Sequence, residues 1–135
     1  MKKLIETVQL QDFSDSRGQL RVTEFYSELG VVAKRIYILS NVPDSAQRGG
    51  HAHKKLKQVF FCLQGSFQMK VSDGASNETV LMSPDTPGVF LRSGLWRDLN
   101  SFSPDAICLV IASEPYDPDD YIGDFDEYLS WRTKA

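Results

Sequence analysis

The sequence has few cysteines, few histidines and no long apolar run. Cys62 and Cys108 are its only cysteines among 135 residues, and each lies inside an apolar segment. Two isolated cysteines form neither a disulfide framework nor a Cys-x-x-Cys zinc motif, so we interpret them as buried, reduced thiols. No apolar run approaches the roughly 20 residues that a membrane-spanning helix needs. The first residues resemble the start of a signal peptide, but no apolar core follows, so we expect a cytoplasmic protein.

The sequence also lacks the excess of basic residues that general nucleic-acid binding needs. Lysine and arginine number 15 against 18 aspartates and glutamates, which gives a formal net charge of −3. A few local arginines still suffice to bind a phosphorylated small molecule. Hydrophobic residues make up 41% and charged residues 24%, as in an ordinary globular protein, and the length predicts one domain over residues 1–135.

Short segments rich in β-branched and aromatic residues alternate with turns that contain glycine or proline, which predicts an all-β domain. Strands of this number and length indicate a sandwich or jelly roll rather than a βαβ fold. The predicted strands are Ile5–Leu10, Gln19–Phe25, Lys34–Asn41, Lys57–Leu63, Ser66–Val71, Thr79–Met82, Gly88–Leu91 and Ala106–Ala112. In one of them Arg35, Tyr37 and Leu39 share a face, and polar residues on the inner face of a strand suit a barrel with a ligand cavity.

The hydrophobic period changes near the C-terminus. Aromatic and aliphatic residues between Tyr121 and Leu129 recur at helical spacing, after Pro118 and two aspartates that are typical of a helix start. We therefore predict one amphipathic helix over residues 119–131. Its aromatic side chains are expected to pack into the core rather than to bind a ligand.

The only two histidines of the chain form the motif His51-Ala52-His53. On a strand, residues i and i+2 point to the same face, so both imidazoles converge on one small volume. Histidine has the ordinary pKa closest to neutrality, which suits a pair that acts as acid and base. Two neutral imidazoles without an anionic ligand or a third histidine are a poor site for a divalent metal. We therefore expect a metal-free site whose histidines transfer protons.

The segment from Gly49 to Gly65 resembles the first motif of the cupin superfamily, Gly…His-x-His…Glu…Gly. Gln58 stands where metal-binding cupins carry glutamate. Arg97, in Leu95-Trp96-Arg97, stands where the second cupin motif has histidine. The resemblance implies a cupin-type double-stranded β-helix, or jelly roll, with a short C-terminal helix.

The chain is more specifically similar to the family of dTDP-4-keto-6-deoxyglucose 3,4-ketoisomerases. The matching stretches are residues 15–20, 34–37, 48–54, 58, 73–74, 95–99, 102–103 and 116–121, and they cover nearly the full chain in order. The resemblance implies an isomerase without a cofactor that acts on a dTDP-linked keto sugar and moves the ketone from carbon 4 to carbon 3 through an enediol. It also implies a homodimer with strands shared between subunits. Asp98 departs from the Trp-Arg-Glu sequence that is common in the family.

The reaction needs a base, a proton donor and hydrogen-bond donors for the developing oxyanion. The resemblance implies His51 and His53 as the proton-transfer pair, with His51 as the main residue, and leaves open which acts as base and which as acid. Tyr37 would position a sugar oxygen or donate to the oxyanion; an alternative is a core aromatic residue. Arg35 lies on the same face of the predicted strand as Tyr37.

The candidates for substrate binding include residues for the diphosphate, the sugar and the base. A guanidinium forks onto phosphate oxygens, which makes Arg17, Arg48 and Arg97 candidates for the diphosphate; for each alone, an ordinary surface arginine is the favoured alternative. Gln58 would hold a histidine tautomer or bond a sugar hydroxyl. Trp96 would stack on the base, with structural burial as the favoured alternative. The predicted binding residues are Arg17, Arg35, Arg48, Gln58, Trp96 and Arg97. Three other functions stay open at this point: a 3,5-epimerase of the same substrate, a metal-dependent cupin oxygenase and a non-catalytic sugar-nucleotide-binding protein.

Overall fold

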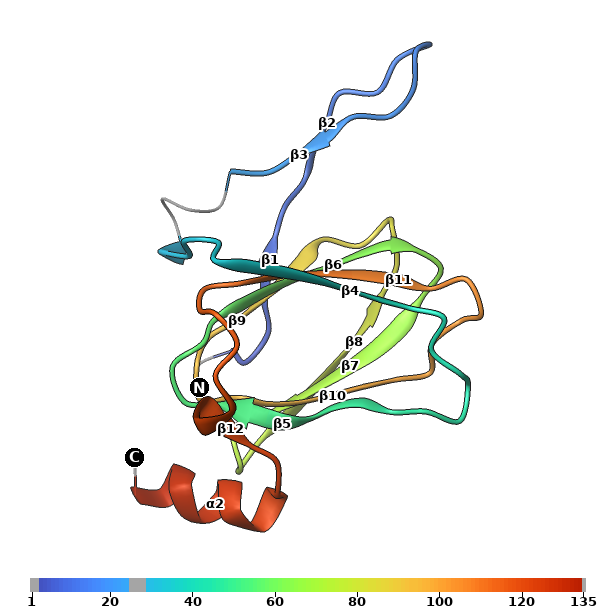
Figure 1. Cartoon of the computed structure of the whole chain (residues 1–135). Coiled ribbons are helices and arrows are strands. Elements are labelled where there is room, and N and C mark those ends of the chain that lie inside the picture. Colours follow the sequence, from blue (N-terminus) through green and yellow to red (C-terminus); the bar gives the residue numbers. More distant parts are fainter. Residues whose placement is uncertain (1–2, 25–28, 135) are drawn as a thin grey trace.

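Two five-stranded antiparallel sheets face each other in the computed structural model, which describes residues 3–24 and 29–134 (Figure 1). The strand order is β1-β9-β6-β11-β4 in the first sheet and β12-β5-β10-β7-β8 in the second. Their bounds are β1 Glu6–Val8, β4 Arg35–Ser40, β5 Arg48–His53, β6 Gln58–Gln64, β7 Phe67–Ser72, β8 Asn77–Met82, β9 Gly88–Leu91, β10 Trp96–Asn100, β11 Ile107–Ala112 and β12 Tyr121–Ile122. With the C-terminal helix α2, Phe125–Lys134, this arrangement confirms the predicted all-β class with a short helix.

The core lies between the two sheets. Inward side chains such as Phe60 from β6, Met69 from β7 and Leu91 from β9 are fully buried there. Cys108 on β11 faces Cys62 on β6 across the strand pair, and both are buried and free. Burial raises the pKa of Cys108 to about 12, so the interpretation as buried thiols is confirmed.

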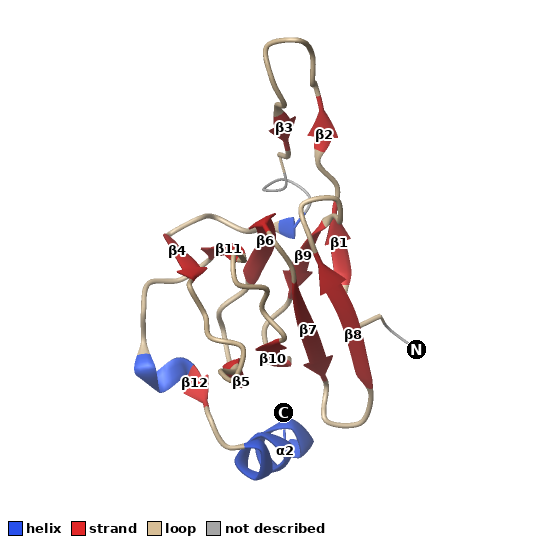
Figure 2. Ribbon diagram, turned by 90° about the vertical axis from the view of Figure 1, so that its right-hand side faces the viewer, coloured by secondary structure: helices blue, strands red, loops and turns tan. Residues whose placement is uncertain are grey.

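A short hairpin projects from the sandwich (Figures 1 and 2). Its strands are β2, Gln11–Asp12, and β3, Arg21–Val22, and we call residues 9–24 the arm. The apolar side chains of Phe13 and Leu20 on the arm are exposed. Of the predicted strand 19–25 only β3 is formed among the described residues, and Phe25 lies outside them.

Three strands of the second sheet, β5, β10 and β12, do not belong to the predicted set. The pair Gly49-Gly50 reads as a turn because glycine is depleted in strands. Both glycines have positive φ, +81° and +69°, and lie opposite the point where the register between β5 and β10 shifts at Arg97 and Asp98. The glycines thus form a β-bulge inside a strand rather than a turn between strands.

The predicted helix over 119–131 is wrong at its start. Residues 118–120 form a 3₁₀ turn, η1, and Tyr121 then pairs with His53 in the ladder between β12 and β5. The helix begins only at Phe125, after Asp124, whose carboxylate accepts the backbone N–H of Asp126 at 2.9 Å. Tertiary strand pairing here overrides the helical spacing of the apolar residues. No helix among the described residues is long and apolar enough to cross a membrane.

Candidate active site

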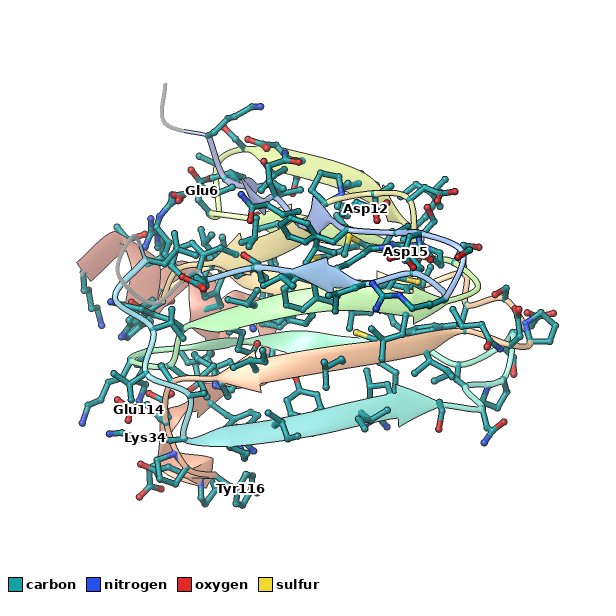
Figure 3. The ribbon with its side chains drawn as sticks, turned by 90° about the horizontal axis from the view of Figure 1, so that it is seen from above. Glu6, Asp12, Asp15, Lys34, Glu114 and Tyr116 are labelled. Carbon is teal, nitrogen blue, oxygen red and sulfur yellow. The ribbon has the colours of Figure 1, made fainter. Side chains whose placement is uncertain are left out.

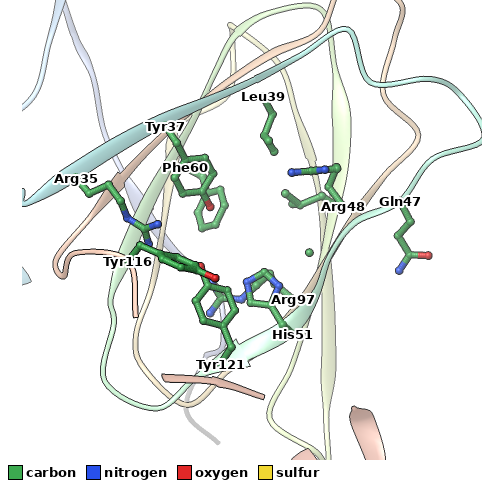
Figure 4. A pocket seen from close by; sticks show the side chains of 12 residues that line it. Arg35, Tyr37, Leu39, Gln47, Arg48, His51, Phe60, Arg97, Tyr116 and Tyr121 are labelled. Atoms are coloured by element: carbon green, nitrogen blue, oxygen red, sulfur yellow. The ribbon is translucent and has the colours of Figure 1, made fainter. Parts of the chain in front are cut away.

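A cavity of about 430 Å³ opens between β4 of the first sheet and β5 and β10 of the second. Five of the residues that the sequence predicts for the site line it, namely Arg35, Tyr37, Arg48, His51 and Arg97. Figure 4 shows Arg35 and Tyr116 on one side of the cavity, with Arg48 and Gln47 on the other. None of the described lining residues is acidic. The cavity is therefore suited to an anionic ligand.

The bulge in β5 places His51 directly opposite Arg97 on β10. Residues opposite each other in an antiparallel pair point to the same face, so both side chains enter the cavity. Glycine is needed at the bulge because a Cβ on Gly49 would lie 2.9 Å from the carbonyl oxygen of Arg97. The positive φ of Gly49 excludes most other residues as well.

The two histidines lie in contact, as their spacing on a strand predicts. Nε2 of His51 is 3.1 Å from Nε2 of His53, and the two rings are nearly perpendicular. His51 lines the cavity, whereas His53 is completely buried behind it. The ring of Tyr121 packs against both, with centroid distances of 5.0 Å to His51 and 4.3 Å to His53.

Both histidines have strongly lowered pKa values. Burial is the largest cause and lowers the pKa of His51 to about 4 and that of His53 to about 2. The nearby Arg97 guanidinium lowers both further because it repels an imidazolium. For His51 the backbone carbonyl of Gly49, which accepts a hydrogen bond from the ring, acts in the opposite direction. Both rings are thus neutral at pH 7, the state that a proton acceptor needs.

Arg97 is completely buried and forms a hydrogen-bonded chain with Gln58 and Tyr37. Its guanidinium donates to Oε1 of Gln58 and, at 3.0 Å, to the carbonyl of Leu95. The amide of Gln58 donates to the Tyr37 hydroxyl at 3.0 Å. Burial raises the pKa of Tyr37 and lowers that of Arg97 to about 10, so both keep their protons at neutral pH. This series of hydrogen bonds holds two proton donors, Arg97 and Tyr37, at the cavity.

Comparison with known proteins identifies this arrangement. The family model described as "FdtA: WxcM-like, C-terminal" matches residues 3–133. The chain belongs to this family. The TDP-4-oxo-6-deoxy-alpha-D-glucose-3,4-oxoisomerase of Aneurinibacillus thermoaerophilus is 31% identical over 129 residues, which are 96% of this chain and 93% of the relative. The predicted family of 3,4-ketoisomerases is thereby confirmed.

Solved structures agree with this assignment. A 3,4-ketoisomerase from Helicobacter canadensis is 32% identical with a TM-score of 0.89, and the match covers 96% of this chain and 97% of the other. A second match is the 3,4-ketoisomerase QdtA from Thermoanaerobacterium thermosaccharolyticum, solved as a histidine-to-asparagine variant in complex with TDP-4-keto-6-deoxyglucose. It is 29% identical with a TM-score of 0.91. That match covers 99% of this chain and 97% of the other.

Three predicted binding residues do not line the cavity, namely Trp96, Gln58 and Arg17. Trp96 precedes Arg97 and therefore faces the other side of β10, where its ring packs on Phe125 at 5.1 Å; it does not enter the cavity of this family member. Gln58 bonds Arg97 and Tyr37 rather than a histidine. Arg17 lies on the arm with an 89% exposed side chain, paired with Asp15 at 2.6 Å, and is outside the cavity of its own chain.

Two aromatic residues of the cavity are not among those that the sequence predicts for the site. Tyr121 falls on the core side of the predicted helix, but β12 turns it toward the histidines. Tyr116 is 65% exposed at the rim of the cavity, close to the ion pair of Lys34 and Glu114 in Figure 3. The Arg35 guanidinium lies 5.8 Å from the Tyr116 ring. Both tyrosines belong to a stretch that matches the family, which was the only signal for them.

Among residues 3–24 and 29–134, no three His, Cys, Asp or Glu side chains lie close enough together to hold a metal ion. Besides His51, the polar side chains that line the cavity belong to three arginines, three tyrosines and Gln47. These groups donate hydrogen bonds or carry positive charge, so they fit a negatively charged substrate better than a cation.

Proposed function

We propose that the protein, folded as a single domain, is a sugar-nucleotide 3,4-ketoisomerase that converts dTDP-4-keto-6-deoxyglucose to a dTDP-3-keto-6-deoxyhexose. The observation that carries this proposal is a neutral, mutually hydrogen-bonded histidine pair at a cavity with three arginines. The QdtA variant binds TDP-4-keto-6-deoxyglucose, and the Aneurinibacillus relative is named for the same sugar nucleotide. The same compound is therefore the substrate that we assign to this chain.

The proposed reaction uses each group of the cavity in a distinct step. His51, the histidine that lines the cavity, removes the proton from carbon 3, and the electron pair delocalises into an enediolate. Arg97 and Tyr37 donate hydrogen bonds to the oxygen that gains negative charge. The proton of the hydroxyl group at carbon 3 passes to the oxygen at carbon 4, and the histidine pair returns a proton to carbon 4, which leaves the ketone at carbon 3. Two nitrogens of the Arg35 guanidinium are buried without a hydrogen-bond partner among the described residues, which suits them to a diphosphate oxygen.

The deciding experiment is incubation of the protein with the 4-keto sugar nucleotide in deuterated water. We expect a 3-keto product with deuterium at carbon 4, because the proton that is returned there exchanges with solvent while it resides on the histidines. Proton and carbon NMR of the product measure both features. A 4-keto product labelled at carbons 3 and 5 would instead indicate a 3,5-epimerase. Tight binding without any isotope exchange would indicate a non-catalytic sugar-nucleotide-binding protein.

Two accompanying expectations from the sequence remain predictions. The reaction should need no metal and no organic cofactor, and metal analysis of the purified active protein, with an assay after chelator treatment, tests this. Loss of activity on chelation would favour the metal-dependent alternative. A cytoplasmic location fits the two free cysteines, since reduced thiols persist in that compartment.

We further propose a homodimer that covers the outer face of the first sheet. Ile36 and Ile38 on the edge strand β4 are 62% and 58% exposed, and they pair across the ladder with Ile111 and Leu109. Exposed apolar patches next to an open sheet edge mark interaction surfaces. The arm, with exposed Phe13, projects beyond this face and is placed to reach a second subunit. Strands shared between subunits would cover both features.

The dimer proposal predicts that Ile38→Glu yields a monomer. A carboxylate buried in an apolar interface without a partner costs at least about 3 kcal/mol, which is roughly 100-fold in the dissociation constant. Size-exclusion chromatography with light scattering measures the mass. Leu81→Glu is the matched control, since Leu81 is 57% exposed on β8 of the other sheet, and it should stay dimeric. A monomeric wild type, or a dimeric Ile38→Glu variant, contradicts the proposal.

A further inference from the structure

We propose that Asp120 is a positioning residue for the histidine pair: its carboxylate accepts the Nδ1–H of His53 and thereby directs the Nε2 lone pair of His53 toward His51. The same carboxylate would balance the positive charge when the pair takes up a proton from the substrate. The inference deepens the proposed ketoisomerase function and rests on it.

The carboxylate of Asp120 is held firmly behind His53. It is only 8% exposed, and its two oxygens accept the backbone N–H groups of Lys55 at 2.8 Å and Leu56 at 3.2 Å. The backbone carbonyl of Asp120 accepts the N–H of Lys54 at 3.0 Å. These bonds attach the turn η1 to the chain that follows β5. A carboxylate fixed in this way cannot rotate away from the imidazole.

The Nδ1 atom of His53 faces this carboxylate. Nδ1 lies 3.5 Å from Oδ2 of Asp120, and the side chain of His53 is completely buried. Among the described residues Nδ1 has no partner in a hydrogen bond of ordinary geometry. Leaving a buried polar nitrogen unpaired is costly, so a shift of a few tenths of an ångström toward Asp120 is favoured.

Counting protons shows why the carboxylate matters. His53 has two contacts that each need one proton: its Nε2 with Nε2 of His51, and its Nδ1 with Asp120. A neutral His53 carries only one proton. An unprotonated Nδ1 would place a lone pair against the carboxylate, which is the less favourable of the two arrangements. His53 therefore rests with a proton on Nδ1, and the lone pair of its Nε2 faces His51.

Two neutral imidazoles can take up one further proton. When His51 removes the proton from carbon 3, the pair gains this proton, and the electron pair of the broken C–H bond stays on the sugar as the enediolate. The pair then carries one positive charge between Arg97 and Asp120. Asp120 already raises the pKa of Arg97 against the larger effect of burial, so its charge acts on this cluster. Return of the proton to carbon 4 restores the neutral pair.

The test is the protonation pattern of His53 together with the kinetics of Asp120→Asn. Nitrogen-15 NMR of the imidazole side chains distinguishes Nδ1–H from Nε2–H, and the chain has only two histidines, so a His51→Asn sample assigns the remaining ring. We expect Nδ1–H on His53 in the substrate-free wild type. An Nε2–H tautomer there overturns the proposal, even if Asp120→Asn does not fold, and this measurement needs no turnover.

In Asp120→Asn we expect kcat to fall by about 10- to 100-fold, the range for loss of a carboxylate that orients a histidine. KM and the Kd of TDP should stay within about twofold, and the His53 tautomer should change. Asp119→Asn makes the same chemical change at an exposed neighbouring position and should behave like wild type. Wild-type kcat with an unchanged tautomer in Asp120→Asn contradicts the positioning role, whereas absence of any isomerase activity with Nδ1–H on His53 contradicts only the proposed function.

Discussion

His51→Asn should lose turnover by roughly 10²–10⁴-fold, the usual contribution of general acid–base catalysis. His51 lines the cavity, and burial together with Arg97 keeps its ring neutral at pH 7. Asparagine occupies a similar volume but cannot take up a proton at any accessible pH. The loss should therefore appear in kcat and in deuterium incorporation at carbon 4, while TDP binding and the melting temperature stay close to wild type.

A matched variant in the same cavity separates proton transfer from binding. Arg35→Met removes a guanidinium with two unpartnered nitrogens and should raise KM with a smaller effect on kcat. His53→Asn compares the two rings, because the fully buried His53 reaches the substrate only through His51 in the proposed scheme. If His51→Asn retained wild-type turnover, the assignment of proton transfer to this residue would be wrong.

Alternation along strands made part of the site predictable from the sequence. The period of two predicts that Arg35 and Tyr37 share a face of β4, and both line the cavity. The same period predicts that His51 and His53 converge, and their Nε2 atoms lie 3.1 Å apart. It also requires Trp96 to face away from Arg97 once both lie on β10, so Trp96 is buried against Phe125, as the favoured alternative to stacking on the base predicts.

Other features could not be read from local sequence because distant contacts determine them. The strand β5 contains a Gly-Gly bulge that is favoured only by the close approach of Arg97 on β10. Residues after Pro118 have helical spacing, yet Asp120 binds two backbone amides near Lys55 and draws Tyr121 into a strand. In both cases a few long-range hydrogen bonds outweigh the local preference, which is worth about 1 kcal/mol per residue at most for residues other than proline.

Arg97→Met should lower kcat by about 10²–10³-fold, the range for loss of one donor to a developing oxyanion, and should also change the pH dependence. The guanidinium lowers the pKa of both histidines, in addition to burial, because it repels the imidazolium form. Its removal must raise both pKa values. The neutral form of His51 is the active one, so acidification should reduce kcat/KM at a higher pH in Arg97→Met than in wild type, where the pKa is about 4.

The conservative variant Arg97→Lys separates the charge from the hydrogen bonds. Lysine keeps a positive charge beside the histidines but cannot reproduce the planar fork that serves both Gln58 and the Leu95 carbonyl. We therefore expect a reduced kcat, whereas kcat/KM should fall on acidification at nearly the same pH as in wild type. Methionine fills much of the same volume and removes the cost of burying a charge, which offsets the loss of the hydrogen bonds to Gln58 and Leu95, so we expect the fold to persist. Histidine titrations by proton NMR measure the pKa shift directly. An unchanged His51 pKa in Arg97→Met would mean that burial alone keeps the base neutral, and that Arg97 acts only on the substrate.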